Sequence, residues 1–250
     1  MLVMRPLSHY GEAIVLIGNK GMRIALMVLA LCVMTGCQPQ PKQVSERIAK
    51  EPSDMRTAVP LVRRLDPNET GAIELEFDVP AWGDNPAPPF FMGLRLTNVD
   101  PAALSNGDST AVADAADRLR RADISAEVHL YRVQQSGQTV VALQRSQWKT
   151  GLGPGEAVVT LAVAADGLVP GLTPADADVG TMEAAGLLPP GSTYREFAKH
   201  RELEFAYVPS LPSGRYRATV RFVRNREALF KENQEVIRSE LIIAYPRQGK

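Results

Sequence analysis

The sequence predicts a mainly β protein, an antiparallel two-sheet sandwich with one short accessory helix. Short segments in which apolar and polar residues alternate recur along much of the chain. A single stretch has a helical pattern, and no strand–helix–strand unit repeats. Because parallel sheets need such repeated crossovers, these observations favour two packed antiparallel sheets.

The strands are expected where the apolar period is two. In residues 73–79 every second side chain is apolar and the side chains between them are acidic, which indicates one buried and one wet face. Further strands are expected at residues 90–99, 124–133, 139–145, 157–164, 202–208, 216–222 and 236–245. The strands at 124–133 and 139–145 should form a hairpin around residues 135–137. Residues 62–65 either begin the domain or end the segment before it, and the pattern leaves both open.

The accessory helix is expected at residues 110–123, with Ser109 as its N-cap and Asp114 near its positive end. Three basic residues should lie near its negative end: Arg118, Arg120 and Arg121. Its apolar stripe is thin, so the helix should cover a sheet edge or mouth instead of forming a core. The stripe consists of Val112, Ala115, Ala116 and Leu119.

Residues 166–192 are rich in Gly, Pro, Ala and Asp and should form a long excursion with one helical turn near Met182. Such loops often carry the function of a β-scaffold.

A turn at residues 211–214 contains Pro and Gly and leads directly into a strand that begins near Tyr216. This arrangement is similar to the tyrosine corner of immunoglobulin-like sandwiches, in which the phenol bonds back to the backbone of the corner. The resemblance implies an immunoglobulin-like sandwich. An ordinary hairpin with a half-buried tyrosine is the alternative.

The segment at residues 23–37 has the pattern of a secretion signal: one basic residue, an apolar run, small residues and Cys37. The run is shorter than the roughly 20 apolar residues that a membrane-spanning helix needs. Met34-Thr35-Gly36-Cys37 resembles the lipobox of a bacterial lipoprotein signal, with Met34 in place of the usual leucine. The alternatives are an ordinary cleaved signal, an uncleaved anchor or a buried helix.

The chain is therefore expected to divide into three parts. Residues 1–36 would be a leader and signal peptide, and a translation start at Met22 would give the signal a compact basic beginning. Residues 37–66 would be the lipidated cysteine and a flexible tether, because they are rich in Pro, Gln, Lys and Glu. Residues 67–250 would form the sandwich. Cys32 would be removed with the signal, so the mature protein would have no disulfide.

Beyond Cys37 the chain resembles proteobacterial lipoproteins of β-sandwich type whose domain has no assigned function. The resemblance rests on the strand at residues 90–96, on residues 211–222 and on a closing strand. It implies a fold and a compartment, and it transfers no active site. Gln38 after the cysteine, instead of Asp, implies the outer membrane, with the domain facing the periplasm or the cell surface.

The charge balance argues against nucleic-acid binding and against a polybasic membrane-binding surface. The chain has 28 basic and 28 acidic residues, and removal of residues 1–36 would leave it slightly acidic. A nucleic-acid binder or a polybasic membrane-binding surface would need a clear basic excess. The expected partners are therefore a membrane, through the lipid on Cys37, and an unknown envelope protein or polymer.

No catalytic constellation, cofactor motif or metal motif is found. His129 should point to solvent from a strand. His200 follows Glu196 by four residues, but two ligands do not make a metal site. The glycines at 151, 153 and 155 precede a strand, not a helix, and so do not form a phosphate-binding loop.

One surface carries a binding hypothesis. Arg215, Arg217 and Arg221 should project from one face of a strand and could contact an acidic partner, a lipid headgroup or an anionic polymer. The favoured interpretation is a solvated face balanced by Glu202 and Glu204 across the sheet.

These patterns together predict a lipid-anchored, non-enzymatic envelope protein with a binding or structural role. One alternative is a periplasmic immunity protein that neutralises a toxic effector. A second is an envelope hydrolase with a carboxylate site in the 166–192 excursion, built from Asp166, Asp176 or Asp178.

Overall fold

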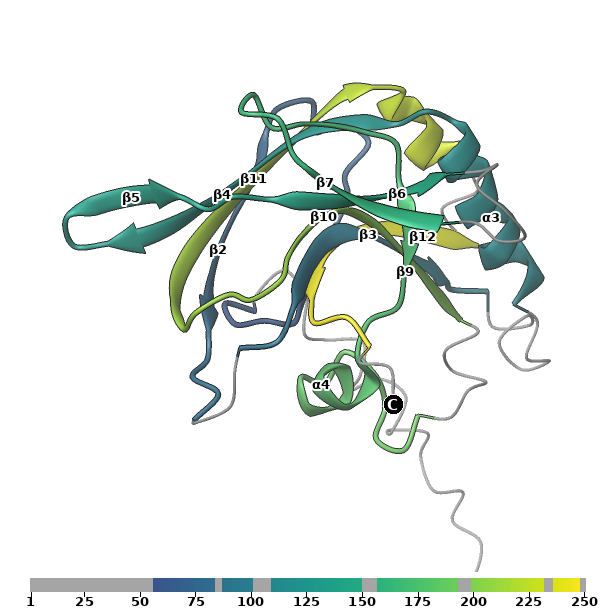
Figure 1. The fold of residues 1–250 in the computed structure, drawn as a ribbon. Helices are drawn as coiled ribbons and strands as arrows, with labels where there is room; N and C mark the ends of the chain where they lie inside the picture. The colour runs from purple at the N-terminus through teal and green to yellow at the C-terminus, as the bar shows by residue number, and fades with distance from the viewer. Residues whose placement is uncertain are drawn as a thin grey trace, which may run out of the picture. The chain divides into compact units, whose positions relative to one another are not determined.

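The computed structural model describes residues 56–83, 87–100, 109–149, 157–192, 199–231 and 236–247. These residues belong to one compact unit, Glu51–Lys250, and their strands pair into two antiparallel sheets (Figure 1). The predicted β-sandwich with a short helix is therefore confirmed.

The larger sheet has the strand order β1-β12-β3-β10-β6-β7, and β9 also pairs with β10. Its members are β1 (Leu61–Arg64), β12 (Ile237–Ala244), β3 (Phe90–Asn98), β10 (His200–Val208), β6 (Gln144–Lys149), β7 (Ala157–Ala162) and β9 (Thr173–Ala175). The smaller sheet has the order β2-β11-β4-β5, and β8 also pairs with β4. Its members are β2 (Ile73–Val79), β11 (Gly214–Arg224), β4 (Ser125–Gln134), β5 (Gly137–Val140) and β8 (Leu168–Pro170).

The main core lies between the two sheets and contains a stack of three aromatic rings. Phe77 of β2 stacks on Phe90 of β3 with ring centroids 5.7 Å apart, and on Tyr216 of β11 at 6.0 Å. Each of these side chains is at most 1% exposed. The alternating apolar residues of both sheets thus face inward and meet, as a sandwich requires.

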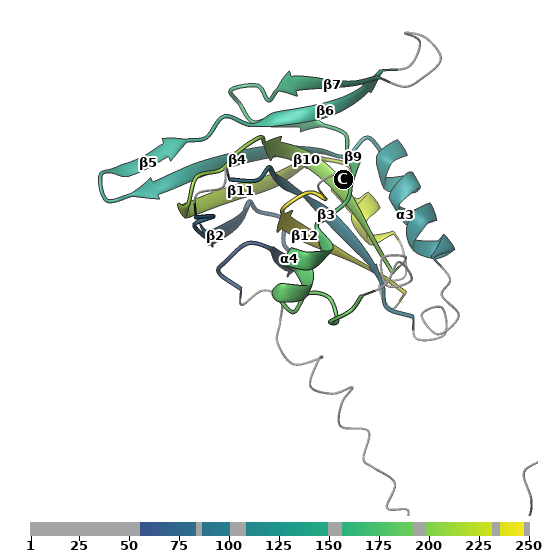
Figure 2. The same ribbon diagram turned by 60° about the horizontal axis from the view of Figure 1, so that its bottom comes forward.

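The accessory helix, α3 (Thr110–Arg121), packs against β3, β10 and β12 at one end of the sandwich (Figures 1 and 2). Its predicted apolar stripe is its buried face, but all four stripe residues belong to the main core. The helix therefore covers one end of the sandwich, as expected, but the expectation that it forms no part of the core is wrong. Ser109 is the N-cap residue, as expected, but its side chain makes no capping hydrogen bond. The first turn has no acidic residue. The basic last turn is confirmed.

The strand expected at residues 139–145 is split between the two sheets. Pairing of β4 with β5 ends at Tyr131↔Val140, where the amide of Val141 still donates to the carbonyl of Leu130. The chain then crosses to the larger sheet, with Leu143 buried in the main core, and resumes as β6. Burial of one apolar side chain at the crossing explains why the alternation continues through it.

Residues 62–65, which the sequence pattern assigned to neither the tether nor the domain, overlap β1, a strand of the larger sheet. β1 pairs with β12 from Leu61↔Ile243 to Arg64↔Glu240. The folded domain therefore includes residues before the expected start at residue 67.

The excursion at residues 166–192 is largely packed structure. It contributes β8, β9 and the short helix α4 (Val179–Ala184), and Met182 is buried as the predicted helical turn requires. A second apolar cluster forms where it meets the outer face of the larger sheet. This cluster consists of Val62, Phe91, Ala177, Met182, Leu188, Ile242 and Ala244. The central strands of the larger sheet are consequently buried on both faces.

Candidate functional site

The arginines singled out in the sequence lie on β11, on the outer face of the smaller sheet. Arg215 and Arg217 both pair with Glu76 of β2, at 2.7 and 2.6 Å, and Arg221 pairs with Glu127 of β4. The expected partners, Glu202 and Glu204, belong to β10 in the other sheet. That part of the interpretation was wrong, because the strand order could not be known from the sequence.

Hydrogen bonds from Arg217 and Arg215 hold the pKa of Glu76 below its usual value. The guanidinium groups of the face are thus already matched to acidic neighbours across adjacent strands. This arrangement is typical of a solvated sheet face, and it leaves less free positive charge for a partner than the sequence suggested.

His129 and His200 both lie in strands. His129 of β4 is half-buried and stacks on Tyr131 at 6.2 Å. His200 begins β10, so the helical spacing that would have paired it with Glu196 does not apply. Glu196, Cys37 and the glycines at 151, 153 and 155 lie outside the described residues. Among the residues that are described, no three His, Cys, Asp or Glu side chains could together hold a metal ion.

The three excursion aspartates do not form one carboxylate site. The carboxylate of Asp166 accepts the amide of Leu168 at the start of β8, in the smaller sheet. The carboxylate of Asp178 caps α4 by accepting a hydrogen bond from the amide of Thr181 at 2.9 Å. The backbone amide of Asp178 donates to the carbonyl oxygen of Tyr245, the residue after β12. Asp166 and Asp178 thus serve local structure on different sheets.

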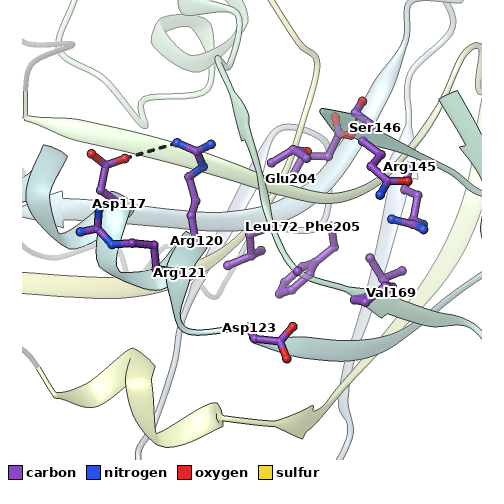
Figure 3. A pocket seen from close by; sticks show the side chains of 14 residues that line it. Asp117, Arg120, Arg121, Asp123, Arg145, Ser146, Val169, Leu172, Glu204 and Phe205 are labelled. Carbon is purple, nitrogen blue, oxygen red and sulfur yellow. Dashed lines mark hydrogen bonds and ion pairs between the residues drawn. The ribbon is translucent and has the colours of Figure 1, made fainter. Parts of the chain in front are cut away.

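A cleft of about 620 Å³ lies between the carboxyl end of α3, β6, the β8–β9 connection and β10. Figure 3 shows Arg120, Arg121 and Asp117 on the helix side, with Arg145, Ser146 and Glu204 opposite them. Phe205 and Leu172 lie between the two sides and are almost fully buried. The cleft therefore has charged walls and an apolar floor, and its volume lies within the range of small-molecule sites.

The cleft results from a change of partner along one edge of β10. On this edge β10 pairs with β9 at Glu202 to Glu204, and with β6 at Tyr207. No strand pairing is seen there for Phe205 and Ala206 among the described residues. On the other edge, the register with β3 shifts between Glu204 and Ala206. Such bulges redirect side chains and occur often beside functional sites.

The side chain of Glu204 links β10 to β6 beside this gap. Its Oε1 accepts a hydrogen bond from the Ser146 hydroxyl at 3.1 Å. Burial raises the pKa of Glu204, and the hydrogen bonds from the Ser146 side chain and backbone oppose that shift. The carboxyl is therefore more readily protonated than a surface glutamate.

A row of charged groups is buried on the outer face of the larger sheet. Arg95 of β3 lies in register with Glu202 of β10 and Glu240 of β12, and the three side chains are 3%, 8% and 6% exposed. Arg95 Nε is 3.8 Å from Glu202 Oε1, and it has no hydrogen-bond partner among the described residues. Burial raises the pKa of Glu202 to about 7 although Arg95 opposes it.

Neither the cleft nor the buried row has a distinct signal in the sequence. Glu202 and Glu204 alternate with apolar residues and therefore looked like a wet face. Arg120 and Arg121 fit the preference for basic residues in the last turn of a helix, so their position gives no sign of a cleft. Charged residues spaced by two within the expected strands were the one available signal, and it does not distinguish a buried row from an exposed one.

No helix formed by the described residues combines the length and the apolarity that crossing a bilayer requires. No family model, no curated protein and no solved structure matches the chain. The function is therefore inferred from the chain's own residues.

Proposed function

We propose that this protein is a lipid-anchored protein of the bacterial cell envelope with a non-catalytic, binding or structural role. Cys37 would carry the acyl chains at the outer membrane, and the sandwich would face the periplasm or the cell surface. The observation that carries the proposal is the abrupt change at Cys37, from an apolar run to a polar, proline-rich segment.

The physics of the anchor supports this proposal. Each buried methylene of an acyl chain contributes about 0.8 kcal/mol, so two or three chains hold a domain at a bilayer durably. The segment after Cys37 has few large apolar residues, and the compact unit begins at Glu51. That leaves a polar spacer of the kind that a tethered domain needs.

The carboxylates of residues 166–192 that the structure describes have structural roles, and this favours a binding role over a hydrolytic one. Asp166 and Asp178 accept backbone amides, while the cleft at α3 offers charged walls above an apolar floor. A cleft of this size and lining is suited to holding a small polar ligand.

The anchor is tested by radiolabelled palmitate incorporation into the full chain and its Cys37→Ser variant. Cys32→Ser is the matched control, since it also removes one thiol. The proposal expects label in the wild type and in Cys32→Ser, none in Cys37→Ser, and recovery of the labelled protein with outer membranes. Label retained by Cys37→Ser, or a mature protein that begins elsewhere without fatty acid, would refute the anchor.

A further inference from the structure

The strand β7 lies at one end of the larger sheet, and its outer edge has no pairing partner among the described strands. Figure 2 shows β7 on the outside of the molecule, beyond β6. The register between these two strands runs from Gln144↔Ala162 to Lys149↔Ala157 without a shift, so the edge is regular. Such an edge presents a row of unpaired N–H and C=O groups to which another strand can be added.

The hydrogen-bond pattern identifies the backbone groups that face this edge. The amide of Val163 donates to the carbonyl oxygen of Leu143, on the β6 side, at 2.9 Å. Because these directions alternate along an antiparallel strand, the N–H and C=O groups of Val158, Thr160 and Ala162 point away from β6. The same three residues are exposed, and Val158 is 53% exposed. The edge therefore offers both backbone groups and side chains to a partner strand.

The other terminal strands of the two sheets have features that discourage such pairing. β1 has four residues, and two of them are arginines. β2 has three acidic residues, and Ala58 bridges it at Asp78. β5 has four residues and begins with glycine. β7, in contrast, has six residues with the sequence Ala-Val-Val-Thr-Leu-Ala, which contains no charge, proline or glycine.

The sequence of β7 suits pairing with a second copy of itself. A two-fold axis at Thr160 pairs all three outward-facing residues, because it sets Val158 opposite Ala162 and Thr160 opposite itself. It also sets Val159 opposite Leu161. Apolar side chains then meet apolar side chains on both sides of the axis, and the uncharged strands do not repel each other. The pairing would add about six backbone hydrogen bonds.

We propose that this protein forms a two-fold dimer in which β7 of one copy pairs antiparallel with β7 of the other, centred on Thr160. The larger sheets of the two copies then form one continuous sheet. Because β7 is only about 20 Å long, the contact is small and the dimer is weak, with a Kd in the micromolar range or above. The inference goes beyond the envelope role proposed above and does not depend on the lipid.

The test uses the full chain, purified in mild detergent, with Cys32→Ser and Cys37→Ser, so that no native thiol remains. Adding Thr160→Cys places two thiols across the axis, where opposite Cα atoms lie about 5.5 Å apart, a spacing that a disulfide can bridge. Mild oxidation should give a covalent dimer on a non-reducing gel. Thr139→Cys lies on the exposed strand β5 of the smaller sheet, and this matched control should stay monomeric.

Charge variants test the register without a covalent bond. In the same background, Thr160→Lys and Thr160→Glu each set like charges opposite each other, so sedimentation velocity should show a dimer weakened by about tenfold or more. An equimolar mixture of the two variants should restore the dimer, because opposite charges then meet across the axis. Thr139→Lys should leave the dimer unchanged.

Three results would overturn the dimer. They are a monomer at every concentration up to about 0.1 mM, equal crosslinking of the Thr160→Cys and Thr139→Cys chains, and no recovery in the mixture of charge variants. Capture of an extended segment of another protein by the edge of a chain that stays monomeric would also overturn it, and would assign β7 to that partner. Because Cys37 is absent from the tested chain, none of these results bears on the anchor.

Discussion

The phenol of Tyr216 donates a 2.7 Å hydrogen bond to the carbonyl oxygen of Pro212, four residues earlier in the chain. The tyrosine ring is fully buried and stacks on Phe77. The turn before β11 is thus tied to the core by one side chain. This is the bond of a tyrosine corner, and it decides between the two interpretations that the sequence left open.

Replacement of Tyr216 by Phe should lower the free energy of unfolding by about 1 kcal/mol, because the ring keeps its packing and only the hydrogen bond is lost. Tyr216→Ala should cost roughly 3 to 5 kcal/mol, because a cavity forms beside Phe77. Denaturant unfolding of the two variants measures both effects. Equal losses would mean that the hydrogen bond contributes nothing separable from the packing.

Replacement of Gly93 by Ala should destabilise the domain by roughly 3 kcal/mol or more. The added Cβ would lie 1.9 Å from the carbonyl oxygen of Leu203, and a backbone atom of the neighbouring central strand cannot move aside. Gly71→Ala is the control, since nothing lies within 4 Å of its Cβ position. Thermal unfolding should show a large fall in Tm for Gly93→Ala alone, and a similar Tm for both variants would contradict this explanation.

The stability of Glu202→Gln relative to the wild type should rise as pH increases from about 4.5 to about 7. Burial raises the pKa of Glu202 from 4.5 in the unfolded chain to about 7, so the wild type loses stability as pH rises through this window. Arg95 and Arg201 oppose the shift and Asp176 adds to it. Urea unfolding of both proteins at several pH values measures the difference.

Two further variants check the sign of this effect. Burial lowers the pKa of His200, so His200→Asn should gain stability relative to the wild type as pH falls below 6.5, the opposite direction. Glu76→Gln should leave the slope between pH 5 and 7 unchanged, because the pKa of Glu76 lies below 4.5. A Glu202→Gln difference that stays flat across the window would show that the carboxyl is not buried in the way described.

Replacement of Arg217 by Ser should raise the pKa of Glu76 toward its usual value, since the bond from Arg217 is the largest cause of the lowering. Arg215→Ser should give a smaller rise in the same direction. Side-chain carboxyl chemical shifts followed by NMR against pH measure this pKa directly. Arg221→Ser is the control because it contacts Glu127, and a change at Glu76 in that variant would exclude the pairing described here.

The period-two alternation located most of the longer strands, because a strand with one buried face needs an apolar residue at every second position. It missed the short strands β8 and β9 and most of β6. The expected strands at residues 73–79 and 90–99 agree with β2 and β3 to within one residue. The buried stripe of α3 was also predictable, because helical spacing places those four residues on one side. The sequence could not locate the crossing at Leu143, because an apolar residue between two sheets continues the same pattern.

The sequence by itself determined the sandwich, the tyrosine corner as one of two alternatives, and the signal pattern from which the anchor is proposed. These features depend on residues that are close together in the sequence, so the sequence shows them directly. Only the tertiary structure decided that Glu76 matches Arg215 and Arg217, that Glu202 is buried beside Arg95, and that α3 and β6 border one cleft. Those relationships depend on strand order and register, which are set by long-range packing and leave no local pattern in the chain.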